Sequence, residues 1–148
     1  MSVEHQTLLE WGRAVLARQP FSVLIGAELS ALEPGRCELQ IPITDQLKQQ
    51  HGFAHGGVVS YLADNALTYA AGSAMQVPVV TSEYKVNYVR PAIGERLIAR
   101  AHAVHVGKSQ AVCRCDIFAV SGGEEKLCAV AQGTIARLGD ANGTSAAA

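Results

Sequence analysis

The stretch from Val58 to Met75, VVSYLADNALTYAAGSAM, decides how this chain folds. Its apolar residues recur at the 3.6-residue period of an α-helix, so they share one face of that helix. The members of this face are Val59, Leu62, Ala63, Ala66, Leu67, Ala70 and Ala74. The stretch therefore predicts one long helix whose apolar side lies in the core.

The opposite face of this helix is polar but nearly uncharged. Asp64 is its one ionisable acid, and no Glu, Lys, Arg or His occurs between residues 58 and 75. Solvated helix faces are usually rich in Lys, Glu and Arg, which are good helix formers. The neighbours of Asp64 are instead Ser60, Tyr61, Asn65 and Thr68. This composition favours contact with another protein surface over contact with water.

Composition limits the class of protein. The chain has 148 residues, of which 49% are hydrophobic and 17% charged, which predicts one compact domain with a sizeable core. The formal net charge of -1, without a Lys/Arg cluster, argues against nucleic acid as a partner. No apolar run approaches the roughly 20 residues that span a bilayer, so we expect a cytoplasmic protein without a membrane partner. Four cysteines form no CxxC pair and are expected to be buried or half-buried: Cys37, Cys113, Cys115 and Cys128.

The remainder of the chain is mainly strand-like. Residues 4 to 18 predict an amphipathic helix, and Pro34-Gly35 predicts a turn between two strands. The expected strands lie at about 22–32, 36–43, 79–89, 97–106, 110–120 and 126–138. Strands on both sides of one helix predict an α+β domain in which an antiparallel sheet covers the helix. We expect an N-terminal helix at 1–20, the main domain at 21–138 and a flexible tail at 139–148.

Two motifs carry a family resemblance. The first runs from His55-Gly56-Gly57 to Asp64, and the second is Val86-Asn87-Tyr88-Val89-Arg90-Pro91. Together they resemble the acyl-CoA thioesterases of the hotdog fold, in particular the PaaI-like (phenylacetate-pathway) branch, over roughly residues 20 to 138. The resemblance implies a long helix wrapped by a curved antiparallel sheet, and subunits that pair into one continuous sheet and assemble as a dimer of dimers. It also implies an acyl-CoA substrate and no cofactor.

Thioester hydrolysis requires a donor that holds the developing oxyanion, and a group that activates water or forms an acyl-enzyme. The carboxyl group of Asp64 suits the role of nucleophile or general base. The backbone N–H of Gly56, near the helix N-terminus, suits the role of oxyanion donor. These residues are eight positions apart, about 12 Å along a helix, so one carbonyl cannot touch both. We therefore expect a homodimer in which each site combines Gly56 of one subunit with Asp64 of its partner.

Further catalytic candidates surround this pair. The resemblance places Gln49 near the thioester as an amide, and Thr68, one turn beyond Asp64, as a hydroxyl that orients water or the carboxylate. Ser82 is a rival for the water-positioning role. A purely structural role is an equal alternative for Gln49, Thr68 and Ser82. His55 is expected to fix its loop by hydrogen bonds.

CoA also carries phosphates, and the chain has few cations to meet them. By resemblance the binding candidates are Gly57, Arg90, Lys108, Ser109 and, behind them, Lys85, although Lys and Arg are ordinary surface residues. His51 and His55 have a spacing that suits a metal, but no third ligand lies nearby in sequence, so no metal is expected.

Two other functions stay open at this stage. A hotdog enoyl-CoA hydratase or dehydratase would pair a His with an acid, and a non-catalytic module would bind acyl-CoA without turnover. The acyl group is also open. Aromatic residues suit an aryl pocket and ordinary packing equally well: Phe53, Tyr61, Tyr69, Tyr84 and Tyr88.

Overall fold

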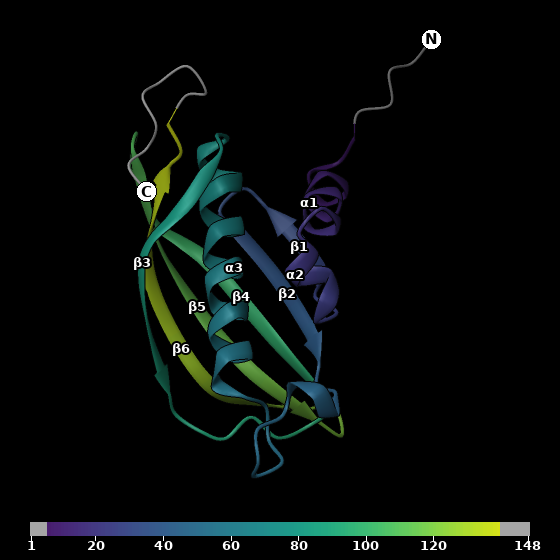
Figure 1. Cartoon of the computed structure of the whole chain (residues 1–148). Helices are drawn as coiled ribbons and strands as arrows, with labels where there is room; N and C mark the ends of the chain where they lie inside the picture. The colour runs from purple at the N-terminus through teal and green to yellow at the C-terminus, as the bar shows by residue number, and fades with distance from the viewer. Residues whose placement is uncertain (1–5, 140–148) are drawn as a thin grey trace.

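The computed structural model describes residues 6–139, which form one antiparallel sheet packed against a long central helix (Figure 1). The central helix, α3, spans Gly56–Met75, and three shorter helical segments are α1 (Leu8–Ala17), α2 (Pro20–Leu24) and the 3-10 turn η1 (Asp45–Leu47). Among the described residues, no helix combines the length and apolar character needed to cross a membrane.

Six strands form the sheet in the order β1-β2-β4-β5-β6-β3, with every neighbouring pair antiparallel. Their bounds are β1 Glu28–Glu33, β2 Arg36–Pro42, β3 Val79–Tyr88, β4 Arg96–Val106, β5 Gln110–Ser121 and β6 Glu124–Arg137. The predicted α+β class and the antiparallel sheet covering one helix are confirmed.

Helix α3 starts two residues before the predicted run and ends where that run ends. His55 is the N-cap, and its Nδ1 accepts a hydrogen bond of 2.8 Å from the Gly57 N–H. Gln76 caps the other end in the left-handed conformation (φ 56°), and its N–H donates to the Gly72 carbonyl at 2.9 Å. Pro78 follows closely and cannot continue a helix.

The apolar face of α3 lies in the core as predicted. Leu62, Ala63, Ala66, Leu67 and Ala70 have no exposed surface, and Val59 is also buried. Small alanine side chains let the helix approach the sheet closely, where the largest buried partners are Leu39, Ile41, Leu97, Ile117 and Ile135. Ala74 differs from the prediction because it is only half-buried near the helix end.

The N-terminal region differs most from the prediction. Helix α1 begins at Leu8 with a reciprocal capping box between Thr7 and Glu10, and the predicted positions 4 and 5 lie outside the described residues. The predicted strand at 22–32 is wrong in its first half. Pro20 starts the short helix α2 there, since its fixed φ suits a first helical position, and β1 begins only at Glu28. Of the predicted tail, only residue 139 is described.

The sheet has two unlike edges. Strand β1 is short and packs against α1, whereas β3 has ten residues and no described strand on its outer side. Val80 and Tyr88 on β3 are 48% and 56% exposed. A long uncovered edge is a template for pairing with another chain.

Candidate active site

Asp64 lies in the middle of α3 and lines a cavity of about 430 Å³. Its Oδ1 accepts a 2.6 Å hydrogen bond from the Thr81 hydroxyl on β3, and its backbone carbonyl accepts one of 2.6 Å from the Thr68 hydroxyl. The carboxylate is half-buried, and no described Lys, Arg or His forms an ion pair with it. A carboxylate held by one neutral donor keeps its second oxygen available for chemistry in the cavity.

A polar network from the N-terminal helices closes one side of this cavity. The buried Ser22 hydroxyl hydrogen-bonds to both the Gln19 amide oxygen and the Tyr61 hydroxyl, and the Asn65 amide donates to Tyr61 at 2.9 Å and to Gln19 at 3.2 Å. Burial raises the pKa of the Tyr61 phenol, and the Asp64 charge adds to this effect, so the phenol stays protonated. These contacts fix Gln19 and Ser22 beside Asp64.

Gly56 is the first residue of α3 and lines a second cavity, of about 570 Å³, together with Gly57, Tyr88 and Arg90. Its carbonyl accepts a 2.9 Å hydrogen bond from the Tyr88 hydroxyl. The Gly57 N–H is occupied by His55, whereas the Gly56 N–H bonds to no described residue. One unpaired N–H at the positive end of a 20-residue helix is a donor suited to an oxyanion.

The Asp64 cavity and the Gly56 cavity share no lining residue. They lie on the same helix but more than two turns apart, as the sequence spacing predicts. Within one chain, the Asp64 carboxylate and the Gly56 N–H therefore lie in separate cavities.

The remaining catalytic candidates are dispersed. Gln49 lies in the loop before α3, where its side-chain oxygen accepts a hydrogen bond from the His51 N–H. Ser82 is exposed and is the extra residue of a bulge between β3 and β6, so the hydroxyl that reaches the carboxylate belongs to Thr81 and not to Ser82. The sequence interpretation missed Thr81 because the contact depends on how β3 packs on α3, which no local pattern reports.

The CoA-binding candidates gather only in part within one chain. Gly57 and Arg90 line the Gly56 cavity, whereas Lys85 is exposed on β3. Lys108 and Ser109 lie in the turn between β4 and β5. The Ser109 carbonyl accepts a hydrogen bond from the Arg137 N–H, so this turn lies at the end of the sheet opposite to Arg90. Any site that uses both Arg90 and Lys108 therefore needs a second chain.

We expect Thr81→Val to lower kcat about tenfold for the thioester hydrolysis that the resemblance implies, because a hydrogen bond to a charged group contributes roughly 1.5–3 kcal/mol. KM should stay close to the wild-type value, whereas the unfolding temperature should fall by several degrees because the folded protein loses this hydrogen bond. Thr81→Ser should restore activity. Steady-state kinetics of both variants beside Ser82→Ala checks this, and a larger loss in Ser82→Ala would transfer the role to Ser82.

The fold defines a class of protein. Residues 51–126 match the Thioesterase superfamily, and the chain belongs to this family of hotdog-fold thioester hydrolases. Its PaaI-like character, expected from the two motifs, is confirmed by the relatives that follow.

Three relatives illustrate the likeness. The 1,4-dihydroxy-2-naphthoyl-CoA hydrolase of Listeria monocytogenes is 30% identical over 114 residues, which cover 76% of this chain and 90% of the relative. The solved PaaI protein of Escherichia coli, from the phenylacetic acid degradation operon, is 26% identical with a TM-score of 0.78, covering 87% of this chain and 93% of that one. A solved thioesterase family protein from Silicibacter pomeroyi is 42% identical with a TM-score of 0.81, covering 84% and 93%.

Proposed function

We propose that this protein hydrolyses aryl- or medium-chain acyl-CoA to the free acid and CoA, with Asp64 as nucleophile or general base. The observation that carries the proposal is the half-buried Asp64 carboxylate beside a cavity, held by Thr81 and with no cation partner among the described residues. The names of the relatives support an acyl-CoA substrate, since they include a naphthoyl-CoA hydrolase and an acyl-coenzyme A thioesterase.

Hydrolysis of the thioester consumes one water molecule as the second reactant. As general base, Asp64 takes a proton from water while the oxygen adds to the thioester carbon, and the Gly56 N–H stabilises the oxyanion. Collapse of the oxyanion breaks the C–S bond, and the CoA thiolate takes up the proton. As nucleophile, Asp64 adds to the carbon itself, CoA leaves, and water then hydrolyses the mixed anhydride.

The two halves of the site meet in a homodimer that pairs the open β3 edges. A two-fold axis through the middle of β3 would place Thr81 opposite Val86 of the partner, two residues from the partner's Tyr88. Because Thr81 contacts Asp64 and Tyr88 contacts Gly56, this pairing brings each carboxylate toward the partner's helix N-terminus. Because the two paired β3 strands run in opposite directions, the turn that holds Lys108 in one chain also lies toward Arg90 of the other. Two such dimers would form the expected tetramer.

A CoA thiol-release assay across aryl and aliphatic acyl-CoAs tests the function. We expect release of free CoA, and no hydroxyacyl-CoA from an enoyl-CoA substrate. The Nδ1 of His55 is occupied as the cap of α3, which supports a structural role for His55 and favours hydrolysis over hydration. Absence of thiol release from every acyl-CoA would overturn the proposal.

The protein's own thiols should not disturb this assay. All four cysteines are buried, and burial raises the pKa of the Cys37 thiol to about 12 and those of Cys113 and Cys128 to about 11. Burial likewise raises the pKa of Cys115. Because the reactive species is the thiolate, we expect Ellman's reagent at pH 8 to leave the native thiols unmodified over minutes and to modify all four after denaturation. Rapid reaction of the native protein would contradict this.

A further inference from the structure

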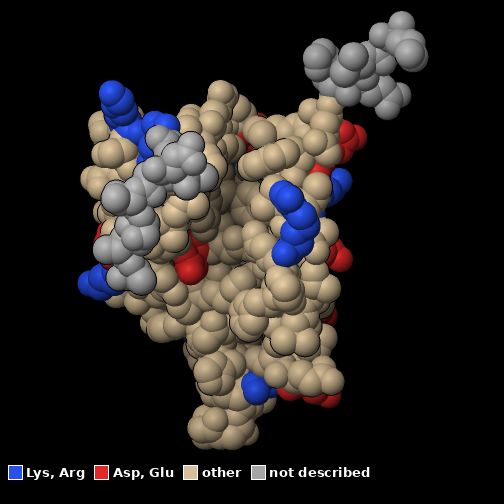
Figure 2. Space-filling view, turned by 45° about the horizontal axis from the view of Figure 1, so that its top comes forward, with Lys and Arg blue, Asp and Glu red and all other residues tan. Residues whose placement is uncertain are grey.

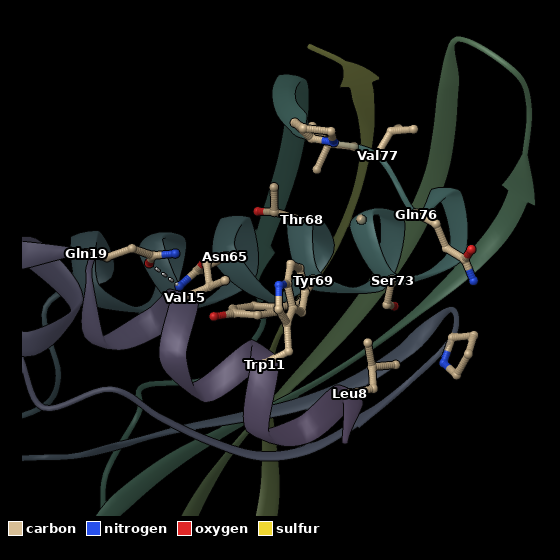
Figure 3. A pocket seen from close by; sticks show the side chains of 14 residues that line it. Leu8, Trp11, Val15, Gln19, Asn65, Thr68, Tyr69, Ser73, Gln76 and Val77 are labelled. Carbon is tan, nitrogen blue, oxygen red and sulfur yellow. Dashed lines mark hydrogen bonds between the residues drawn. The ribbon is translucent and has the colours of Figure 1, made fainter. Parts of the chain in front are cut away.

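A groove of about 590 Å³ runs between α1 and the C-terminal half of α3 (Figure 3). The two helices are antiparallel here, because Gln19 lies beside Asn65 at one end and Leu8 lies toward Ser73 at the other. Tyr69 joins them in the middle, where its hydroxyl donates to the Gly12 carbonyl at 2.8 Å. Hydrogen bonds from Tyr69 and Asn65 thus hold the two sides of the groove together.

The lining of this groove is uncharged. Helix α1 contributes Leu8, Trp11 and Val15, and the segment after α3 contributes Val77, Pro78 and Val79. None of the 14 described lining residues is acidic, basic or a histidine. Figure 2 shows a hollow on this face of the molecule, with acidic atoms on its left side, basic atoms on its right side and uncharged surface between them. Such a lining suits an apolar ligand.

The groove adjoins the Asp64 cavity where a hydrogen bond joins Gln19 to Asn65 of α3. Gln19, Asn65 and Thr68 line both spaces, and Thr68 also bonds to the Asp64 backbone carbonyl. From Asn65 the groove follows α3 as far as Gln76, a length of about 16 Å at the rise of an α-helix. A ligand whose reacting carbonyl sits at Asp64 can therefore extend along this path without crossing the core.

We propose that this groove, here called the α1–α3 groove, binds the acyl chain of the substrate, and that the chain is an unbranched aliphatic one of medium or long length. The proposal rests on the acyl-CoA hydrolysis proposed above and narrows its substrate class. A single aromatic ring fills only the part nearest Asn65, whereas an extended chain contacts the apolar side chains along the whole length. Binding strengthens with each added methylene until the groove is filled.

Trp11 supplies a test that needs no turnover. It is the chain's single tryptophan, it lines the groove, and it is 44% exposed. Dodecyl-CoA, a thioether that cannot be hydrolysed, should shift the Trp11 emission to shorter wavelength below its micelle concentration. Butyl-CoA and CoA alone should not. Absence of a shift with dodecyl-CoA, or an equal shift with CoA alone, would overturn the proposal even if hydrolysis is confirmed.

Chain-length kinetics supply the second test. Val15→Phe places a ring in the middle of the groove, and Ala14→Phe, on the exposed side of α1, is its matched control. We expect Val15→Phe to lower kcat/KM for dodecanoyl-CoA at least about tenfold and to leave butanoyl-CoA within about twofold. Ala14→Phe should change neither.

Equal loss at both chain lengths, or no loss with dodecanoyl-CoA, would contradict the proposal. So would an aryl-CoA preferred over every aliphatic one and unaffected by Val15→Phe. If Val15→Phe changes the oligomeric state on size-exclusion chromatography and its kinetics do not depend on the length of the acyl chain, the groove is an interface with a second copy of the protein. If the wild type releases no thiol from any acyl-CoA, the proposed function fails, while the Trp11 emission still decides whether the groove binds the chain.

Discussion

Asp64→Asn is expected to lower kcat for thioester hydrolysis more than about a hundredfold, a loss of roughly 3 kcal/mol of transition-state stabilisation. The substitution removes the charge that adds to the carbonyl or takes the proton from water. It keeps the side-chain shape, and the amide oxygen can still accept the hydrogen bond from Thr81. The fold and KM should therefore change little, and circular dichroism, thermal unfolding and steady-state kinetics measure the three effects.

Asp116→Asn is the matched control for this experiment. Asp116 is exposed on β5 and belongs to neither cavity, so the same chemical change there should leave kcat near the wild-type value. Thiol release by Asp64→Asn at the wild-type rate would remove Asp64 from the mechanism.

The second large effect is a recovery of activity when two inactive variants are mixed. Gly56→Pro removes the proposed oxyanion donor but suits the first position of a helix, and the extended His55 before it (ψ 137°) is compatible with proline. We expect both Gly56→Pro and Asp64→Asn to be inactive alone. In a mixed dimer, one site combines the intact Asp64 of one chain with the intact Gly56 of the other. Random reassociation of equal amounts should thus restore about a quarter of the wild-type activity.

Two measurements make this result decisive. Native mass spectrometry of a size-tagged chain shows whether mixed dimers have formed, and mixed dimers without recovered activity would contradict the shared site. Gly56→Ala is the control for added bulk, since it keeps the N–H and its Cβ would lie 3.5 Å from the Tyr88 ring, an ordinary contact. It should retain most of the activity.

Local patterns predicted the parts of this fold that local physics determines. The 3.6-residue period located α3 to within two residues of its start, and alternation with turn residues located five of the six strands closely. Segment 22–32 was mispredicted because an apolar run of this length suits strand and helix alike. In the structure, Pro20 starts a short helix in which Phe21 and Leu24 are exposed, and the strand follows that helix.

The sequence predicted only those residues of the candidate site that belong to a recognisable motif. The motif around Gly56 and Asp64 predicted two separated half-sites, and the structure places these residues in separate cavities. Thr81 was not predictable, nor was the network that joins Gln19 and Ser22 to α3, because these contacts link residues at least 17 positions apart in sequence. They depend on the packing of the N-terminal helices and β3 around α3.

Helix α3 carries the N–H of one proposed site and the carboxylate of the other. In the proposed dimer, each copy of α3 therefore contributes to both active sites. The rise of the helix sets the distance between its Gly56 N–H and its Asp64 carboxylate. In that dimer the two centres are linked through a continuous helix and not through a loop.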